Sequence, residues 1–128
     1  MSKLLLVCAG GALGSGARYL VGSWAGQAWG PGFPWGTLAV NLAGSFLIGV
    51  VMVLGIETAV ISEEWRVFLA VGIMGGFTTY SSFNHETLAL AQRGHWGLAF
   101  AYVAATVLGG WAAGVAGLVL ARGLASGA

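Results

Sequence analysis

Five consecutive hydroxyl-bearing residues, Thr78 to Ser82, interrupt a long apolar stretch shortly after the glycine pair Gly75-Gly76. Glycine in a helix interior costs about 1 kcal/mol relative to alanine, and two β-branched threonines follow closely. We therefore expect the helix to break near residues 75–79. A break frees backbone carbonyls, which suit a small cation, and amides and hydroxyls, which suit an anion. The alternative is a kinked helix whose hydroxyls bond back to their own backbone.

Tyr80 and Phe83 bring aromatic rings to the same stretch. Residues three apart lie on nearly the same face of a helix, and the edges of aromatic rings carry partial positive charge. Such edges can hold a small, hard anion without the full charge that would slow its release. Taken alone, an aromatic pair at this spacing is more often plain packing.

Other polar residues lie in apolar stretches elsewhere. An amide such as Asn41 is costly in lipid unless it is hydrogen-bonded, so it either donates to a passing anion or holds a neighbouring helix. Thr106 follows Tyr102 by one helical turn, and Gly110 and Gly114 continue that face. The two glycines are also spaced as a helix-packing face.

Two charged residues, Arg18 and Glu86, also lie near or within the apolar stretches and could interact with an ion. Arg18 lies roughly 21 Å along the helix axis from Leu4, so it can snorkel to the membrane surface, attract anions into a vestibule, or pair with Glu86 or a lipid phosphate. We expect a vestibule or structural role. Glu86 follows Phe83 by three residues. His85 is expected to be an interfacial polar residue.

The elements that position these residues are membrane-spanning helices. The 128 residues are 58% hydrophobic and 7% charged, whereas soluble domains carry about 25% charged residues. A net charge of +1 gives no reason to expect a nucleic-acid partner. A crossing helix needs about 20 apolar residues. We predict an all-α integral membrane protein with one transmembrane domain over residues 1–128 and helices at 4–24, 37–56, 66–92 (broken near 75–79) and 96–121.

Charge placement leaves the orientation of these helices open. Lys3, Arg66 and Arg122 lie on one predicted face, and Arg18 and Arg93 on the other. A bias of one basic residue is too small to orient a protein clearly. Insertion in both directions is one reading, and it leads to a dimer of oppositely oriented copies with its axis in the membrane plane. A single orientation set by factors outside the sequence is the other.

The segment G-G-F-T-T-Y-S-S-F-N-H-E at 75–86 resembles the signature of the Fluc/CrcB fluoride channels, commonly G-G-φ-T-T-F-S-T-F-x-x-E, where φ is apolar. The similarity extends to Arg18 in a glycine-rich first span, to P-W-G-T-L-A-V-N-L-A-G at 34–44 and to R-G-H-W at 93–96. It covers essentially the whole chain. Tyr80 departs from the usual phenylalanine, and Gly110 and Gly114 offer no hydroxyl where the family's fourth helix tends to carry them.

The resemblance implies a passive fluoride channel of the bacterial inner (plasma) membrane, built as an antiparallel, dual-topology homodimer with two pores. It also implies a structural Na⁺ at the dimer centre, held by the backbone carbonyls of Gly75 and Thr78. Arg18 and Glu86 correspond to vestibule or supporting residues. The implied fluoride-pore residues are Asn41, Thr79, Tyr80, Ser81, Phe83, Tyr102 and Thr106.

Two other functions are compatible with a small four-helix membrane protein. A proton-coupled multidrug exporter tolerates dual topology, but it needs an intramembrane carboxylate, and the first two spans have none before Glu57. A purely structural subunit of a larger complex is the second. The sequence shows no metal-ligand cluster, catalytic triad or phosphate-binding loop, so we expect no enzymatic activity.

Overall fold

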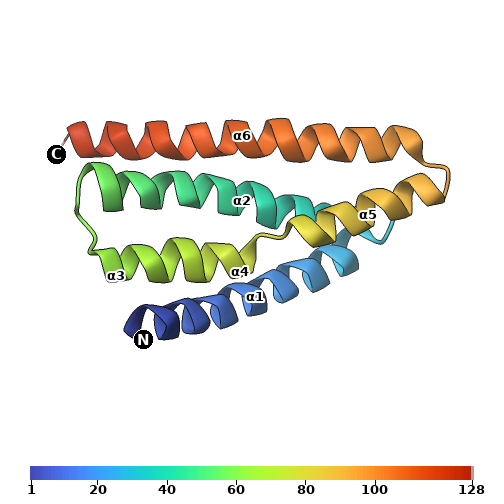
Figure 1. Ribbon diagram of the computed structural model, residues 1–128. Helices are drawn as coiled ribbons and strands as arrows, with labels where there is room; N and C mark the ends of the chain where they lie inside the picture. The colour runs from blue at the N-terminus through green and yellow to red at the C-terminus, as the bar shows by residue number, and fades with distance from the viewer. Residues whose placement is uncertain (128) are drawn as a thin grey trace.

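The computed structural model describes residues 1–127, which form four helical passes (Figure 1). The first pass is α1 (Ser2–Trp29), and the second is α2 (Trp35–Met52) continued by the π-helical segment η1 (Val53–Glu57). The fourth is α6 (Trp96–Ser126). The third pass is made of four pieces: α3 (Glu63–Arg66), π-helical η2 (Val67–Met74), α4 (Gly75–Phe77) and α5 (Tyr80–Gln92).

Three of these passes are uninterrupted and apolar enough to cross a membrane. They are Ser2–Trp29, Trp35–Glu57 and Trp96–Ser126, with mean hydropathies of 1.5, 2.2 and 1.9. The third pass is divided by its break, so no single helix in it reaches the necessary length. The predicted all-α fold with four passes is confirmed, and the first and fourth helices extend several residues beyond their predicted ends.

The third pass begins at a capped turn. The Ser62 hydroxyl accepts a hydrogen bond from the backbone N–H of Trp65 at 3.3 Å, and Glu63 and Glu64 occupy the first turn. Carboxylates there interact favourably with the positive end of the helix dipole. The backbone amide and the Ser62 hydroxyl hold the pKa of Glu64 below its usual value. Ser62 is therefore the N-cap of the third pass.

The first and third passes touch backbone to backbone. A Cβ atom on Gly10 would lie 2.6 Å from the carbonyl oxygen of Phe68, and one on Gly72 would lie 2.9 Å from the Cα of Gly10. Any side chain at these glycines would push the helices apart. Small residues at such contacts are typical of helices that associate in lipid.

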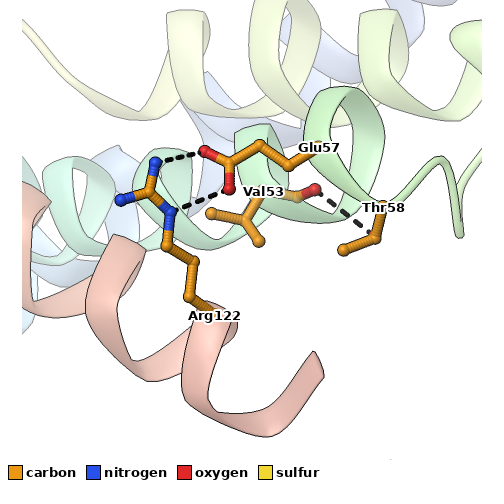
Figure 2. A network of polar contacts seen from close by, with 4 residues as sticks. All are labelled: Val53, Glu57, Thr58 and Arg122. Carbon is orange, nitrogen blue, oxygen red and sulfur yellow. Dashed lines mark hydrogen bonds and ion pairs between the residues drawn. The ribbon is translucent and has the colours of Figure 1, made fainter. Parts of the chain in front are cut away.

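Both chain termini and α3 lie at one end of the bundle, while the α5–α6 connection lies at the other (Figure 1). Two ion pairs link different passes at the end of the bundle that holds both chain termini, called the terminal end below. Lys3 Nζ lies 2.6 Å from Glu63 Oε1, and Arg122 donates to both oxygens of Glu57 at 2.6 and 2.8 Å (Figure 2). Because these pairs are exposed, solvent screens them and they contribute little to stability.

Candidate ion-conducting site

The third pass is interrupted at Thr78 and Thr79. Both have extended backbones, with φ and ψ of −79° and 156° for Thr78 and −152° and 116° for Thr79. Gly75 and Gly76 were expected within the break but are helical members of α4. A Cβ at position 76 would lie 2.5 Å from the carbonyl oxygen of Gly11. Gly76 therefore serves the close approach of α1, and the break is shorter than predicted.

Asn41 holds the break in place from α2. Its Oδ1 accepts from the Thr79 backbone N–H at 2.8 Å, and its Nδ2 donates to the Thr79 carbonyl at 3.0 Å. One amide thus pairs both backbone groups of a residue outside the helices. Of the two roles considered for Asn41, the structure shows the helix-to-helix hydrogen bond. An amide nitrogen carries two hydrogens, so one remains for another acceptor.

Arg18 lies on α1 beside the same break. Its Nε donates to the Gly76 carbonyl at 3.0 Å, and Ser15 Oγ lies 3.5 Å from that oxygen. In a continuous helix this carbonyl would accept from the N–H of Tyr80, four residues later. Arg18 therefore caps a backbone group that the break has freed. The hydrogen bond is to this carbonyl and not to Glu86, which was one of the partners considered.

The break also deprives two carbonyls of their helical donors. In a continuous helix Gly75 O would accept from Thr79 N, and Thr78 O from Ser82 N. Thr79 N instead donates to Asn41, and Ser82 N donates to the Thr79 hydroxyl at 3.2 Å. A Cβ on Gly75 would meet nothing within 4 Å, so it faces open space. The carbonyls of Gly75 and Thr78 thus lack the backbone donors that a continuous helix would give them.

A groove of about 350 Å³ lies beside the break, among α2, the third pass and α6. The rings of Tyr80 and Phe83 meet there edge to face, with centroids 5.6 Å apart. Tyr80 is 77% exposed, whereas Phe83 is 6% exposed. The groove brings together most of the predicted pore and cation residues: Asn41, Gly75, Thr78, Thr79, Tyr80, Phe83 and Thr106.

A polar chain of contacts supports Phe83 from behind. Its ring stacks on Tyr102 with centroids 5.1 Å apart and an interplanar angle of 11°. The Tyr102 hydroxyl donates to Glu86 Oε2 at 2.9 Å, and the Thr37 hydroxyl donates to Glu86 Oε1 at 2.7 Å. Glu86 therefore positions Tyr102, which orients the Phe83 ring. Tyr102 is fully buried, so it lies behind Phe83 and not on the groove wall.

Thr106 and Ser81 lie in different surroundings. The Thr106 hydroxyl oxygen is buried and has no hydrogen-bond partner within residues 1–127. Leaving such a group unpaired costs about 1–3 kcal/mol, so the groove is suited to a polar guest. Ser81 is exposed, and its Oγ lies 3.4 Å from Thr79 Oγ1.

A second hollow of about 370 Å³ lies on the α1 side of the break. Arg18, Thr37 and Ser82 line it, and Thr79 lines both this hollow and the groove. Arg18 was expected in a vestibule or structural role; it lines this hollow and also bonds to the break.

Two residues of this arrangement were missed by the sequence analysis. Thr37 precedes Asn41 by four residues and shares its helix face, so this spacing was a usable signal. Ser15 precedes Arg18 by three residues, but small residues are so common in α1 that its position carried no signal.

Four helical passes, three of them long and apolar enough to cross a membrane, and a polar break lined by two hollows define the class of a small multi-pass membrane protein. The chain belongs to the CrcB family: the family described as "CrcB-like protein, Camphor Resistance (CrcB)" matches residues 5–118. The resemblance seen in the motif is confirmed.

Curated relatives cover nearly all of the chain. A protein of Anaeromyxobacter dehalogenans named "Fluoride-specific ion channel FluC" is 57% identical, covering 98% of this chain and 99% of its own length. Proteins with the same name from Caulobacter vibrioides and Agrobacterium fabrum are 54% and 49% identical. They cover 95% and 97% of this chain, and 97% and 99% of their own lengths.

Proposed function

We propose that this protein is a fluoride-selective channel that lets fluoride leave the cell passively and so relieves fluoride toxicity. The names of relatives up to 57% identical over nearly the whole chain support this function. The proposed location is the inner (plasma) membrane of a bacterium. A passive channel needs no catalytic step, in keeping with the expectation that the protein is not an enzyme.

The observation that carries the proposal is the position of Thr79 between two hollows. An anion attracted by Arg18 enters the hollow on the α1 side. It passes the extended backbone at Thr79 and continues along the groove, past Tyr80 and Phe83 toward Thr106. The break is thus the point at which the path changes from one side of the third pass to the other.

The groove offers uncharged hydrogen-bond donors and ring edges to an ion that has lost part of its water. Its donors are the free N–H of Asn41, the hydroxyl of Thr106 and the ring edges of Tyr80 and Phe83. The described residues that line it carry no formal charge. Conduction requires sites that bind strongly enough to admit an ion and weakly enough to release it. A full positive charge in the groove would bind tightly and release slowly.

The proposed assembly is an antiparallel homodimer with two pores. In one chain the groove is open along one side, and Tyr80 on its wall is 77% exposed. A second copy, related by a twofold axis in the membrane plane, would close that side and generate an identical path beside it. The assembly requires insertion in both orientations.

A structural Na⁺ at the dimer centre is part of the proposal. Gly75 and Thr78 would each contribute one freed carbonyl, and the second copy would contribute the same two. Within residues 1–127 no cluster of three His, Cys, Asp or Glu side chains offers another metal site. When bound, the ion supplies positive charge that holds the two breaks together.

Efflux from liposomes tests the proposal. Purified protein is reconstituted into vesicles loaded with fluoride or chloride, and ion release is followed with ion-selective electrodes. Fast loss of fluoride with retention of chloride is expected. Absence of any flux would favour a structural subunit and refute the channel.

The same assay tests a proton-coupled multidrug exporter, which predicts transport only under a proton gradient. That mechanism needs a carboxylate that exchanges protons with a cationic substrate. Both oxygens of Glu86 are already occupied by Thr37 and Tyr102, which argues against it.

A further inference from the structure

The fourth pass carries glycines, which have no side chain, on the face of α6 that continues the groove beyond Thr106. Thr106 is followed on the same face of α6 by Gly110 and Gly114, one helical turn apart. A Cβ on Gly110 would meet only one atom within 4 Å, the Oγ of Ser45 at 3.6 Å. The face of α6 beyond Thr106 is therefore bare, and a hydroxyl from α2 lies against it.

Ser45 occupies the level of Gly110 along the bundle. Helices α2 and α6 run in the same direction, toward the end that holds both termini (Figure 1). Asn41 precedes Ser45 by four residues, as Thr106 precedes Gly110, and each step advances about 6 Å along its helix. Asn41 and Thr106 thus form one level of the groove, and Ser45 with Gly110 forms the next.

Ser45 belongs to the wall of the same groove as Asn41 and Thr106. The buried hydroxyl of Thr106 has no hydrogen-bond partner among the described residues, so its O–H is available to donate to a guest that accepts a hydrogen bond. Asn41, Thr106 and Ser45 all present N–H or O–H donors, and Phe83 presents a ring edge. A row of donors with no cation in it suits a small, hard anion.

We propose that Ser45 forms a second anion subsite, one turn from Thr106 toward the terminal end. Its hydroxyl donates from α2 at the level where Gly110 gives α6 no donor. The ligand is a partly dehydrated fluoride ion, which moves from the Asn41–Thr106 level to the Ser45 level as it crosses the protein. This inference rests on the proposed function, because it extends the same ion path.

Moving the hydroxyl between helices tests the subsite. Ser45→Ala removes the donor, and Gly110→Ser in the same chain returns one from α6 into the space that the Ser45 Oγ has left. Ser45→Ala is expected to slow fluoride efflux about tenfold, the effect of losing one hydrogen bond to a charged group. Ser45→Ala/Gly110→Ser should recover most of the rate. The matched control Ser45→Ala/Gly110→Ala restores volume without a hydroxyl and should remain slow.

A second measurement separates the subsite from the proposed function. The rise in melting temperature of the detergent-solubilised protein on adding sodium fluoride, with sodium chloride as reference, reports binding without transport. It should be smaller in Ser45→Ala and recover in Ser45→Ala/Gly110→Ser. If the unchanged protein shows no fluoride efflux, the proposed function fails and this shift still decides the subsite.

Two results would overturn the subsite. One is a Ser45→Ala protein with unchanged efflux and unchanged fluoride-dependent melting. The other is equal recovery with alanine or serine at position 110, which would assign Ser45 a packing role. Size-exclusion chromatography of each variant checks that the assembly is preserved.

Discussion

At the break, some residues hold the backbone by hydrogen bonds, and others line the groove. The side-chain oxygen of Asn41 accepts a hydrogen bond from Thr79, and one of its N–H groups donates to the same residue. The Nε of Arg18 donates to the carbonyl of Gly76. Phe83 makes no such bond and presents its ring to the groove. A substitution at Phe83 therefore changes the groove wall while the polar contacts that hold the break remain.

Phe83→Ile is expected to reduce fluoride efflux about tenfold or more. Isoleucine keeps the position apolar but removes the ring edge, and a barrier increase of about 1.4 kcal/mol lowers a rate tenfold. It also removes the stacking on Tyr102, worth about 0.5–1.5 kcal/mol, so a small loss of stability accompanies the effect. Efflux from liposomes and the elution volume of the purified protein are the measurements.

Phe100→Ile is the matched control. Phe100 lies on α6 and is 71% exposed, and it does not line the groove. This variant should conduct like the unchanged protein. A Phe83→Ile protein with the same efflux as the control would remove Phe83 from the path.

At the scale of helices, the contact between α1 and the third pass supports the break. Gly14 faces the carbonyl of Ile73 and the N–H of Phe77 so closely that no Cβ fits between the backbones. Gly14→Ala is expected to destabilise the protein by about 1–3 kcal/mol, as overpacking does. Thermal unfolding in detergent, followed by circular dichroism, measures the loss.

Gly16→Ala provides the comparison within the same helix. A Cβ on Gly16 would meet nothing within 4 Å, and alanine is the better helix former by about 1 kcal/mol. Its melting temperature should equal or exceed that of the unchanged protein. Equal melting temperatures for the alanine variants at positions 14 and 16 would mean that α1 does not need its close approach.

Three of the passes could be predicted from the sequence because each is a long apolar stretch. The exact site of the break could not. Gly75 and Gly76 were the obvious weak points by helix propensity, yet they stay helical because Gly76 meets the backbone of α1. Within the predicted range 75–79, the chain opens only at Thr78 and Thr79, where Asn41 offers the backbone of Thr79 replacement hydrogen bonds.

The groove residues were predicted as a set through the family motif, but their partners were not. The bond from Arg18 to Gly76 joins residues 58 apart in the chain, and the bond from Thr37 to Glu86 joins residues 49 apart. Such pairs depend on how helices cross, and no local spacing encodes that. The unpaired hydroxyl of Thr106 likewise becomes visible only once its neighbours are known.

For the whole molecule, both the open side of the groove and the distribution of basic residues between the two ends bear on how two copies assemble. The terminal end carries Lys3, Arg66 and Arg122, and two of these pair with carboxylates. Acidic residues contribute little to orientation, so the pairs leave the bias of one basic residue unchanged. The antiparallel dimer proposed above needs both orientations in one membrane.

Charge variants can separate the two orientations and then recombine them. Ser2→Lys/Ser126→Lys adds two basic residues to the terminal end, and Lys3→Gln/Gln92→Lys/His95→Lys shifts the excess to the other end. By the positive-inside rule each variant should insert in one direction, opposite to the other, as a C-terminal reporter active on only one side of the membrane would reveal. The unchanged protein should show both orientations with the same reporter.

Vesicles from cells with either variant alone should have little fluoride efflux, whereas co-expression should restore it, because only the mixture can form antiparallel pairs. Full efflux from either single-orientation variant would contradict the antiparallel dimer.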